Sequence, residues 1–429
     1  MEESICYKHI NPADYGITAT HKEIIIGNDL FANFFDIIDK LSLGKNYLII
    51  TDKNINEAIL QSFSHLLSNK NIIILPGNVK AKLSITDLII RELINYDYAI
   101  AIGSGTINDL VKYASYKTNK KYIIFATSPS MNGYLSANSS LINDYNIKQS
   151  YQAHSPIAAY FDINIMVNSP VRLIKSGLGD SLCSHTVKAD NLLSHYLLNT
   201  PYSELPFKII HTLENTLLDN IDGFNNKDPE IITVLTKILI LSGLAMLHTG
   251  NSSSASQGEH LIAHLYEILD PKNSHKTFHG EQIAVTCLYM NQLQEMMLTN
   301  DTAPQLINQD ISMADLKFLP RAIRANIYNN FQQARISSKD TKKINLKLTR
   351  IWPDLRSTIL ANYRSSTYLL KILNKANLPT NIADLKWQKK HFHLASTNAH
   401  LIKNRFTFLN LTHTHTVIPH LMRYLVDSK

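Results

Sequence analysis

The sequence predicts an α/β protein: an N-terminal domain built on a parallel sheet, followed by an all-helical C-terminal domain. Two observations predict this division. In the first third of the chain, short β-branched runs alternate with helical patterns at the spacing of strand–helix–strand units. After Ser169-Pro170, strand-like runs nearly vanish and long helical periodicities take over. We therefore expect an α/β domain over residues 1–168 and a helical domain over residues 169–429.

Each element of the first domain has a local signal. Short apolar runs predict strands at Lys22–Ile26, Tyr47–Thr51, Ile72–Leu75, Tyr98–Ile102 and Tyr122–Ala126. Helical periodicity predicts a helix that ends at Leu41, one that runs through Leu67, one that ends near Tyr96 and one that follows Gly105. The stretch Ser84-Ile85-Thr86-Asp87 has the pattern of a capping box and is expected to open the third of these helices. A sheet built this way binds its ligand at the carboxyl ends of the strands.

The second domain is expected to consist of long helices. They are predicted at Ser181–Leu198, Pro206–Leu218, Pro229–Met246, Gly258–Leu269 and Gly280–Leu298, with more to the end of the chain. No apolar run approaches the ~20 residues that cross a bilayer, and Ile238–Leu247 is interpreted as a core helix. The polar stretch Asn251–Ser256 precedes a helix start and is interpreted as a structured loop.

Composition narrows the possible functions. A hydrophobic content of 45% with 18% charged residues is typical of a folded globular protein. Three widely spaced cysteines and an N-terminus without a basic start or apolar core indicate a reducing, cytoplasmic location. The net charge of +7 comes from scattered basic residues, and no basic tract contains interspersed aromatic residues. This pattern disfavours nucleic-acid binding and is compatible with a phosphorylated substrate.

The segment Asp97–Tyr116 combines a buried strand, a glycine turn and a helix. Gly103 and Gly105 lie where the strand turns into the helix. The unpaired N–H groups and positive dipole at such a helix N-terminus bind phosphate. Taken alone, the G-x-G pattern fits an ordinary strand-to-helix turn equally well, because the full dinucleotide fingerprint is absent.

Three elements of the second domain carry candidate metal ligands. Gly177–Asp180 is predicted to be a small-residue turn that places the Asp180 carboxylate at the start of a helix. His260 and His264 share one helix face at i and i+4, and His279 lies where a loop enters a helix. One carboxylate and two imidazoles suit Zn²⁺, Fe²⁺ or Ni²⁺. Each element also has a simpler interpretation, since Asp180 could be a helix cap and most of the eighteen histidines must have no ligand role.

Five motifs in order resemble one known family, the glycerol-1-phosphate dehydrogenases of the iron-containing alcohol dehydrogenase and dehydroquinate synthase superfamily. They are GSGTINDLVKYAS at Gly103–Ser115, ATSPSMNGYLS at Ala126–Ser136, GLGD at Gly177–Asp180, SQGEHLIAH at Ser256–His264 and HGE at His279–Glu281. The resemblance runs through most of the first 300 residues, and beyond them we find no usable motif. It implies a Rossmann-like N-terminal domain for the nucleotide and a helical domain for metal and substrate, with the active site in the cleft between them.

The resemblance also implies a role for individual residues. The pyrophosphate of NAD(H) or NADP(H) would lie on Gly103, Ser104, Gly105, Thr106 and Ile107. Other cofactor contacts would come from Thr127, Ser128, Pro129, Ser130 and Ser136. One divalent metal, expected to be Zn²⁺ with Fe²⁺ or Ni²⁺ as alternatives, would be held by Asp180, His260 and His279. His264 would act on the substrate as a catalytic residue together with Asp180, and Asn132 would contact the substrate. Asp52 follows a strand at the position where an acidic residue binds the adenosine ribose and disfavours a 2′-phosphate.

The activity that follows from this resemblance is hydride transfer between NAD(P)H and a small phosphorylated ketone, dihydroxyacetone phosphate, giving sn-glycerol 1-phosphate. Two other activities of the superfamily stay open: another polyol dehydrogenase, and a carbocycle synthase of the dehydroquinate type. A non-enzymatic binding protein is disfavoured because the three ligand positions and the cofactor glycines are all present. We also expect a homo-oligomer.

Asn132 is the one departure from the family pattern, which has aspartate at this position. Asparagine keeps the size and hydrogen-bonding reach of aspartate but has no negative charge and cannot accept a proton. The substrate is therefore less determined by the sequence than the reaction type.

Overall fold

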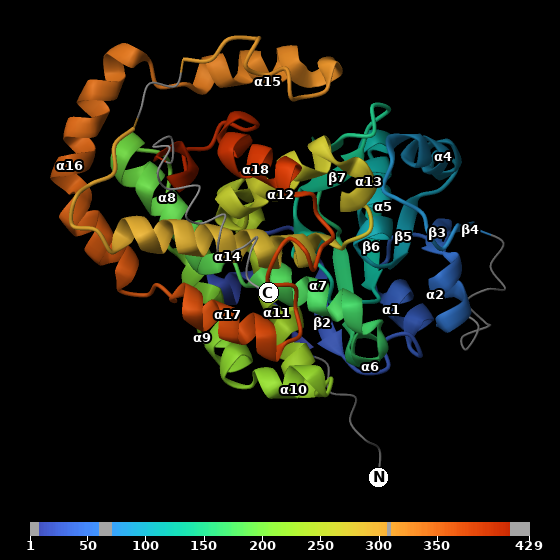
Figure 1. Cartoon of the computed structure of the whole chain (residues 1–429). Coiled ribbons are helices and arrows are strands. Elements are labelled where there is room, and N and C mark those ends of the chain that lie inside the picture. The colour runs from blue at the N-terminus through green and yellow to red at the C-terminus, as the bar shows by residue number, and fades with distance from the viewer. Residues whose placement is uncertain (1–7, 60–70, 307–309, 412–429) are drawn as a thin grey trace. The chain divides into compact units, whose positions relative to one another are not determined.

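The computed structural model describes residues 8–59, 71–306 and 310–411. Contacts within the chain divide it into two compact units (Figure 1). The first comprises the residues up to 181 together with 208–251, and the second comprises 182–207 and the residues from 252 onward.

A seven-stranded sheet forms the centre of the first unit. Its order is β1-β2-β9-β6-β5-β3-β4, and all neighbours are parallel except β1 and β2. The strands are β1 (Lys8–His9), β2 (Glu23–Gly27), β3 (Tyr47–Asp52), β4 (Ile72–Leu75), β5 (Tyr98–Gly103), β6 (Lys121–Ala126) and β9 (Ala158–Asp162). Every residue of β3, β5 and β9 is buried. The continuous apolar runs therefore reflect strands covered on both faces.

The first unit also contains helices that connect these strands or follow the last of them. They are α1 (Phe34–Lys40), α2 (Lys53–Ala58), α4 (Leu83–Leu93), α5 (Gly105–Thr118), α6 (Ile163–Asn168), α7 (Val171–Ser181), most of α9 (Leu205–Asp219), α10 (Ile221–Asn225) and α11 (Pro229–Thr249). A hairpin of β7 (Asn138–Ile142) and β8 (Lys148–Gln152) packs through β7 against α5. The packed aromatic rings of Phe31, Phe34, Phe125 and Tyr160 lie in the core between α1 and the sheet.

The strand order creates a switch point between β3 and β5. From β3 the chain continues outward to β4, whereas from β5 it continues in the opposite direction to β6. Right-handed crossovers then place α2 on one face of the sheet and α4 and α5, which pack on each other, on the opposite face. Doubly wound sheets bind nucleotides at such a switch point, beyond the carboxyl ends of the strands.

The second unit is helical. Its helices are α8 (Ser184–Leu198), α12 (Gly258–Leu269), α13 (Pro271–Ser274), α14 (His279–Leu298), α15 (Arg321–Ala334), α16 (Ser338–Leu360), α17 (Ser366–Lys375) and α18 (Lys389–Asn398). Three short 3-10 helices complete it: η4 (Ser252–Ser254), η5 (Ala399–Leu401) and η6 (Phe408–Leu411). Most residues of α14 are buried, and it packs against α8, α12 and α17. It is the central helix of this unit.

Most predicted elements are present with ends shifted by up to three residues, and some local predictions are wrong. The Ser84–Asp87 capping box does not form, because α4 begins at Leu83 and Lys82 precedes it without a side-chain cap. Gly177–Asp180 is not a turn at a helix start but part of the last turns of α7. The helix predicted from Ser181 begins instead at Ser184.

Some strands were not predicted, and other predictions differ from the structure or lie outside the described residues. Strands β7, β8 and β9 were missed. The far part of the helix predicted through Leu67 lies outside the described residues. The contact-based units also differ from a single cut near residue 168, because α11 returns to pack on α6 and α7. The functional division at residue 168 stays a prediction.

Among the described residues, α11 is the one helix long and apolar enough to cross a membrane by length and composition. It is 67% buried over its most apolar window, as in the core helix of a soluble protein. Its contacts with α6, α7 and the 3-10 helix η3 (Gly133–Leu135) agree with the predicted core helix.

Candidate active site

The glycine turn joins β5 to α5 at the switch point. Gly103 ends β5, Ser104 precedes the helix without a side-chain cap, and α5 begins at Gly105. A Cβ atom on Gly105 would lie 2.6 Å from Sδ of Met131, so this position has room only for glycine unless Met131 moves. The backbone N–H groups of the first helical turn are thus presented at the carboxyl edge of the sheet, where an anion binds.

Buried hydroxyl groups lie at the same edge. Thr127 follows β6, and its N–H donates to the Gly103 carbonyl at 3.1 Å. The side-chain oxygens of Thr51, Thr127 and Ser128 are buried and have no hydrogen-bond partner among the described residues. Because an unpaired buried hydroxyl costs free energy, these three oxygens fit a site that a polar ligand completes.

The loop after β6 is held tightly against two helices. A Cβ on Gly177 of α7 would lie 1.7 Å from the Pro129 carbonyl oxygen, and one on Gly243 of α11 would lie 2.8 Å from that of Asn132. Ser176 donates its hydroxyl to the Ser130 carbonyl at 3.2 Å. Helical glycines thus let the loop backbone approach both helices.

This packing brings Asn132 to Asp180. The Asn132 backbone N–H donates to Oδ2 of Asp180 at 3.0 Å, and Asp180 is 2% exposed. The bond orients the carboxylate of the predicted metal ligand. Since it comes from the backbone, it does not depend on whether residue 132 is asparagine or aspartate.

A fully buried lysine supports the same loop from α5. Nζ of Lys112 donates to the Gly133 carbonyl at 2.6 Å, to the Asn138 carbonyl at 3.2 Å and to Oγ of Ser136 at 3.3 Å. Burial lowers the pKa of Lys112 to about 8, although the charge of Asp109 acts to raise it. Burial also raises the pKa of Asp109 to about 6, although Lys112 acts to lower it. The Ser136 hydroxyl, predicted to contact the cofactor, is engaged in this network and is 4% exposed.

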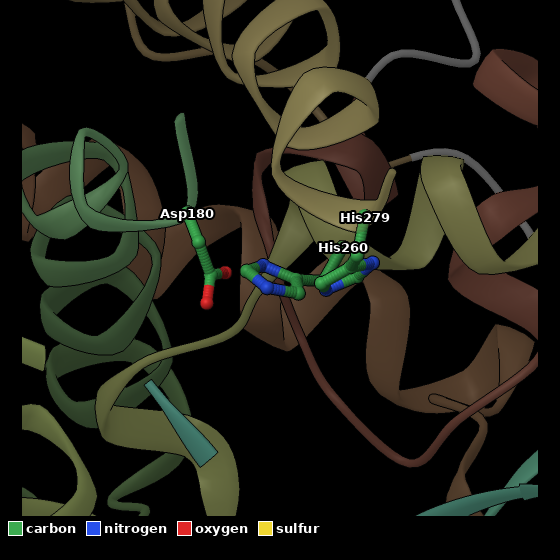
Figure 2. Close-up of side chains that lie close together, drawn as sticks. All are labelled: Asp180, His260 and His279. Atoms are coloured by element: carbon green, nitrogen blue, oxygen red, sulfur yellow. The ribbon is translucent and has the colours of Figure 1, made fainter. Parts of the chain in front are cut away.

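Three histidines gather in the second unit. His260 and His264 lie one turn apart on α12, and His279 is the first residue of α14. The ring centroids of His260 and His279 are 5.2 Å apart, and those of His264 and His279 are 5.7 Å apart with nearly parallel planes. Figure 2 shows His260 and His279 with Asp180, the three predicted metal ligands.

A buried carboxylate orients His260. Oε1 of Glu259 lies 2.8 Å from Nδ1 of His260 and also accepts the Gln257 N–H at 2.7 Å. With Nδ1 held in this way, the ring would bind a metal through Nε2, the usual arrangement of a ligating histidine. Glu259, His260 and Cys183 also form a second group of potential metal donors, but Glu259 is 0% exposed and already bonded to the ring.

The sequence left several supporting residues without a role: Asp109, Lys112 and Glu259. The sequence could not single out Lys112, because Asn108, Lys112 and Ser115 form a polar stripe at helical spacing that is typical of an exposed face, yet all three are buried. Asp52 was predicted to bind ribose. In the structure its carboxylate caps α2 by accepting the N–H groups of Asn54 and Ile55 at 2.9 and 3.1 Å.

Comparison with known proteins agrees with this geometry. Residues 25–170 match the model of a family described as iron-containing alcohol dehydrogenase. The glycerol-1-phosphate dehydrogenase [NAD(P)+] of Thermococcus sibiricus is 32% identical over 277 residues, which cover 63% of this chain and 76% of that protein. The Pyrococcus horikoshii protein of the same name is 30% identical over 272 residues. These residues cover 63% of this chain and 77% of the Pyrococcus horikoshii protein. A probable glycerol dehydrogenase from Sinorhizobium meliloti shares the fold, with a TM-score of 0.62 and 15% identity over 94% of this chain and 95% of its own.

Fold, glycine turn and relatives together define a metal-dependent, NAD(P)-linked oxidoreductase of the iron-containing alcohol dehydrogenase class. Within that class, the chain belongs to the glycerol-1-phosphate dehydrogenase family. The predicted family, fold class and reaction type are confirmed.

Proposed function

We propose that this protein is an NAD(P)-dependent sn-glycerol-1-phosphate dehydrogenase that interconverts dihydroxyacetone phosphate and sn-glycerol 1-phosphate. The observation that carries the proposal is the 32% identity, over 277 residues, to a protein of that name. The net charge of +7 is compatible with an anionic substrate.

We propose that Asp180, His260 and His279 hold one divalent metal, Zn²⁺. One carboxylate and two imidazoles are a donor set that suits this ion and leaves a position open for substrate. Two contacts support the assignment: the Asn132 N–H orients the Asp180 carboxylate, and Glu259 orients the His260 ring. Fe²⁺ and Ni²⁺ suit the same donors.

The proposed cofactor site is the carboxyl edge of the sheet. The N–H groups of Gly103–Ile107 would hold the pyrophosphate, and the unpaired hydroxyls of Thr127 and Ser128 would complete the surroundings of the dinucleotide. Pro129 and Ser130 continue this wall. We now assign Ser136 a supporting role, because its hydroxyl accepts from Lys112.

When bound, the metal would polarise a carbonyl group and the nicotinamide would give or take a hydride. The chain's own residues would orient the substrate and move the proton. His264 is half-buried and lies one helical turn from His260, which supports the proposal that its imidazole would exchange a proton with the substrate oxygen. Asn132 would contact the substrate through its amide.

A second candidate is a dehydrogenase of another small polyol, because residue 132 departs from the aspartate of the family pattern and leaves the substrate less determined than the reaction type. We further propose a cytoplasmic location and a homo-oligomeric assembly.

The test is oxidation of NADH and NADPH by the metal-loaded protein with a panel of phosphorylated and free ketoses, followed by determination of the product's chirality. We expect dihydroxyacetone phosphate to be the best substrate, to give sn-glycerol 1-phosphate, and to react with NADH at least as well as with NADPH. A higher kcat/KM for an unphosphorylated ketose would favour the second candidate. Formation of the opposite enantiomer would contradict the proposal.

A further inference from the structure

The C-terminal part of the chain reaches the loop that precedes α12. Arg405 donates through Nη1 to the carbonyl and hydroxyl oxygens of Ser256, the latter at 3.1 Å, and through Nη2 to Oγ of Ser252 at 2.7 Å. This polar loop therefore does not depend on α12 alone for its conformation. It is tied to a residue about 150 positions further along the chain.

Two buried carboxylates lie at the start of α12. Asp190 is 0% exposed, and its Oδ2 accepts the Gly258 N–H at 3.0 Å while its Oδ1 accepts the Gln294 amide at 3.1 Å. Glu259 holds His260. Burial, and next the charge of Glu259, raise the pKa of Asp190 to about 7. The charged form of Asp190 is thus disfavoured, and a nearby cation would stabilise both carboxylates.

Arg405 supplies that cation. Burial lowers its pKa to about 10, and the charges of Glu259 and Asp190 act in the opposite direction. The same segment makes a second attachment, since the Phe408 N–H donates to Oδ1 of Asp190 at 2.9 Å. The segment thus contributes both positive charge and hydrogen bonds to the start of α12.

We propose that Arg405 is a positioning residue for His260: it braces the Ser252–Ser256 loop, which leads into Gln257, and the Gln257 N–H holds Glu259 so that Glu259 keeps the His260 ring in its ligating orientation. This rests on the proposed role of His260 as a metal ligand. It gives a function to the C-terminal region, in which the sequence shows no motif.

The experiment measures the affinity of the metal-free, full-length protein for Zn²⁺ by competition with a chromophoric chelator, at a temperature where each variant is folded. We expect Arg405→Met to weaken Zn²⁺ binding about ten-fold or more, the size usual for residues that orient a metal ligand. Arg405→Lys, which keeps the charge but not the forked hydrogen bonds, should recover part of the loss. The control is Arg324→Met, whose guanidinium donates to the carbonyls of Leu319 and Lys317, outside this network; it should bind Zn²⁺ like wild type.

A double-mutant cycle decides whether Arg405 acts through Glu259. If it does, Arg405→Met should cost less affinity in a Glu259→Gln background than in wild type, whereas additive losses would overturn the proposal. Wild-type affinity in Arg405→Met would overturn it as well. Should Arg405→Met not fold, the same cycle is run with Arg405→Lys.

Failure of the proposed function gives a different result. If wild type binds no Zn²⁺, or if His260→Ala binds it as tightly as wild type does, then the metal assignment is wrong. Loss of binding in His260→Ala with full binding in Arg405→Met rejects only the role of Arg405.

Discussion

At the scale of single residues, Asn132 connects the loop after β6 to Asp180, the proposed metal ligand. The backbone N–H of Asn132 donates to Asp180, so the side chain of Asn132 takes no part in this bond. A neutral amide can donate a hydrogen bond and does not repel a phosphorylated substrate, whereas a carboxylate cannot donate and does repel it. We therefore expect phosphorylated substrates to be preferred over free dihydroxyacetone or glycerol.

Asn132→Asp tests this role. The substitution should narrow the preference for phosphorylated substrates, while Zn²⁺ and NADH affinities stay as in wild type because the backbone bond to Asp180 is kept. The measurement is kcat/KM for both substrate types in both proteins. Equal ratios would mean that the side chain of residue 132 does not distinguish the substrates, as for a simple turn residue before Gly133.

The buried His185 is expected to make the fold less stable at acidic pH. Burial, and next the charge of Arg364, lower its pKa from 6.5 to about 3, and its Nε2 accepts the Asn291 amide at 2.7 Å. Because the folded-state pKa is the lower one, the neutral ring stabilises the fold fully above pH 6.5, and this contribution is lost as the pH falls toward 3.

His185→Gln should remove this contribution. Relative to the variant, wild type is expected to lose up to about 1.4 kcal/mol of unfolding free energy per pH unit below pH 6.5. Urea unfolding at several pH values from neutral to mildly acidic measures the difference. His248→Gln, at an exposed position, is the control and should follow wild type. Parallel pH curves for His185→Gln and wild type would contradict the assignment.

At the scale of elements, two helices approach the loop after β6 at a glycine each. Helix α7 does so at Gly177, where the neighbouring atom is a backbone oxygen that cannot rotate away. The loop carries Asn132, and α7 carries Asp180. The close approach of α7 to the loop therefore sets the position of Asp180, a proposed metal ligand.

Gly177→Ala should destabilise the protein, although the higher helix propensity of alanine by itself would add about 1 kcal/mol to the unfolding free energy. The 1.7 Å approach to the Pro129 oxygen forces α7 away, and overpacking of this kind costs about 1–3 kcal/mol. The comparison is Gly223→Ala in α10, where the nearest atom would be a side-chain carbon at 3.2 Å. Urea unfolding of both variants should show a loss for Gly177→Ala alone, and equal midpoints would refute the packing argument.

At the scale of the whole molecule, the proposed metal would contribute to the stability of the folded protein. A ligand that binds only the folded protein stabilises it by mass action, by about 4 kcal/mol at a thousand-fold excess over its Kd. Metal removal should therefore affect stability as well as activity.

We expect one Zn²⁺ per chain, a fall in Tm after chelation, and recovery of both Tm and activity when Zn²⁺ is restored. His260→Ala should contain little metal, should be inactive, and should show no change in Tm on chelation. Metal analysis with thermal unfolding of both proteins provides the check. A His260→Ala protein with full metal content and near-normal turnover would exclude His260 as a ligand.

The sequence by itself determined the fold class, the five principal strands, most of the long helices and the ordered motifs that define the family. These features are local, because the period of apolar residues reports whether a segment is buried on one face or two. Element ends were less well determined. Helix α4 starts before its apparent capping box, and α7 continues through two glycines, because tertiary packing overrides weak local preferences.

Only the tertiary structure decided how the candidate site is supported. The Asn132 N–H on Asp180, the three bonds of Lys112 to the loop after β6, and Arg405 on the loop before α12 join residues 21 to 149 positions apart. No periodicity encodes such pairs, and a buried lysine or arginine looks like a surface residue in the sequence. Their burial is tolerable because each charge meets hydrogen-bond acceptors that only the folded chain brings to it.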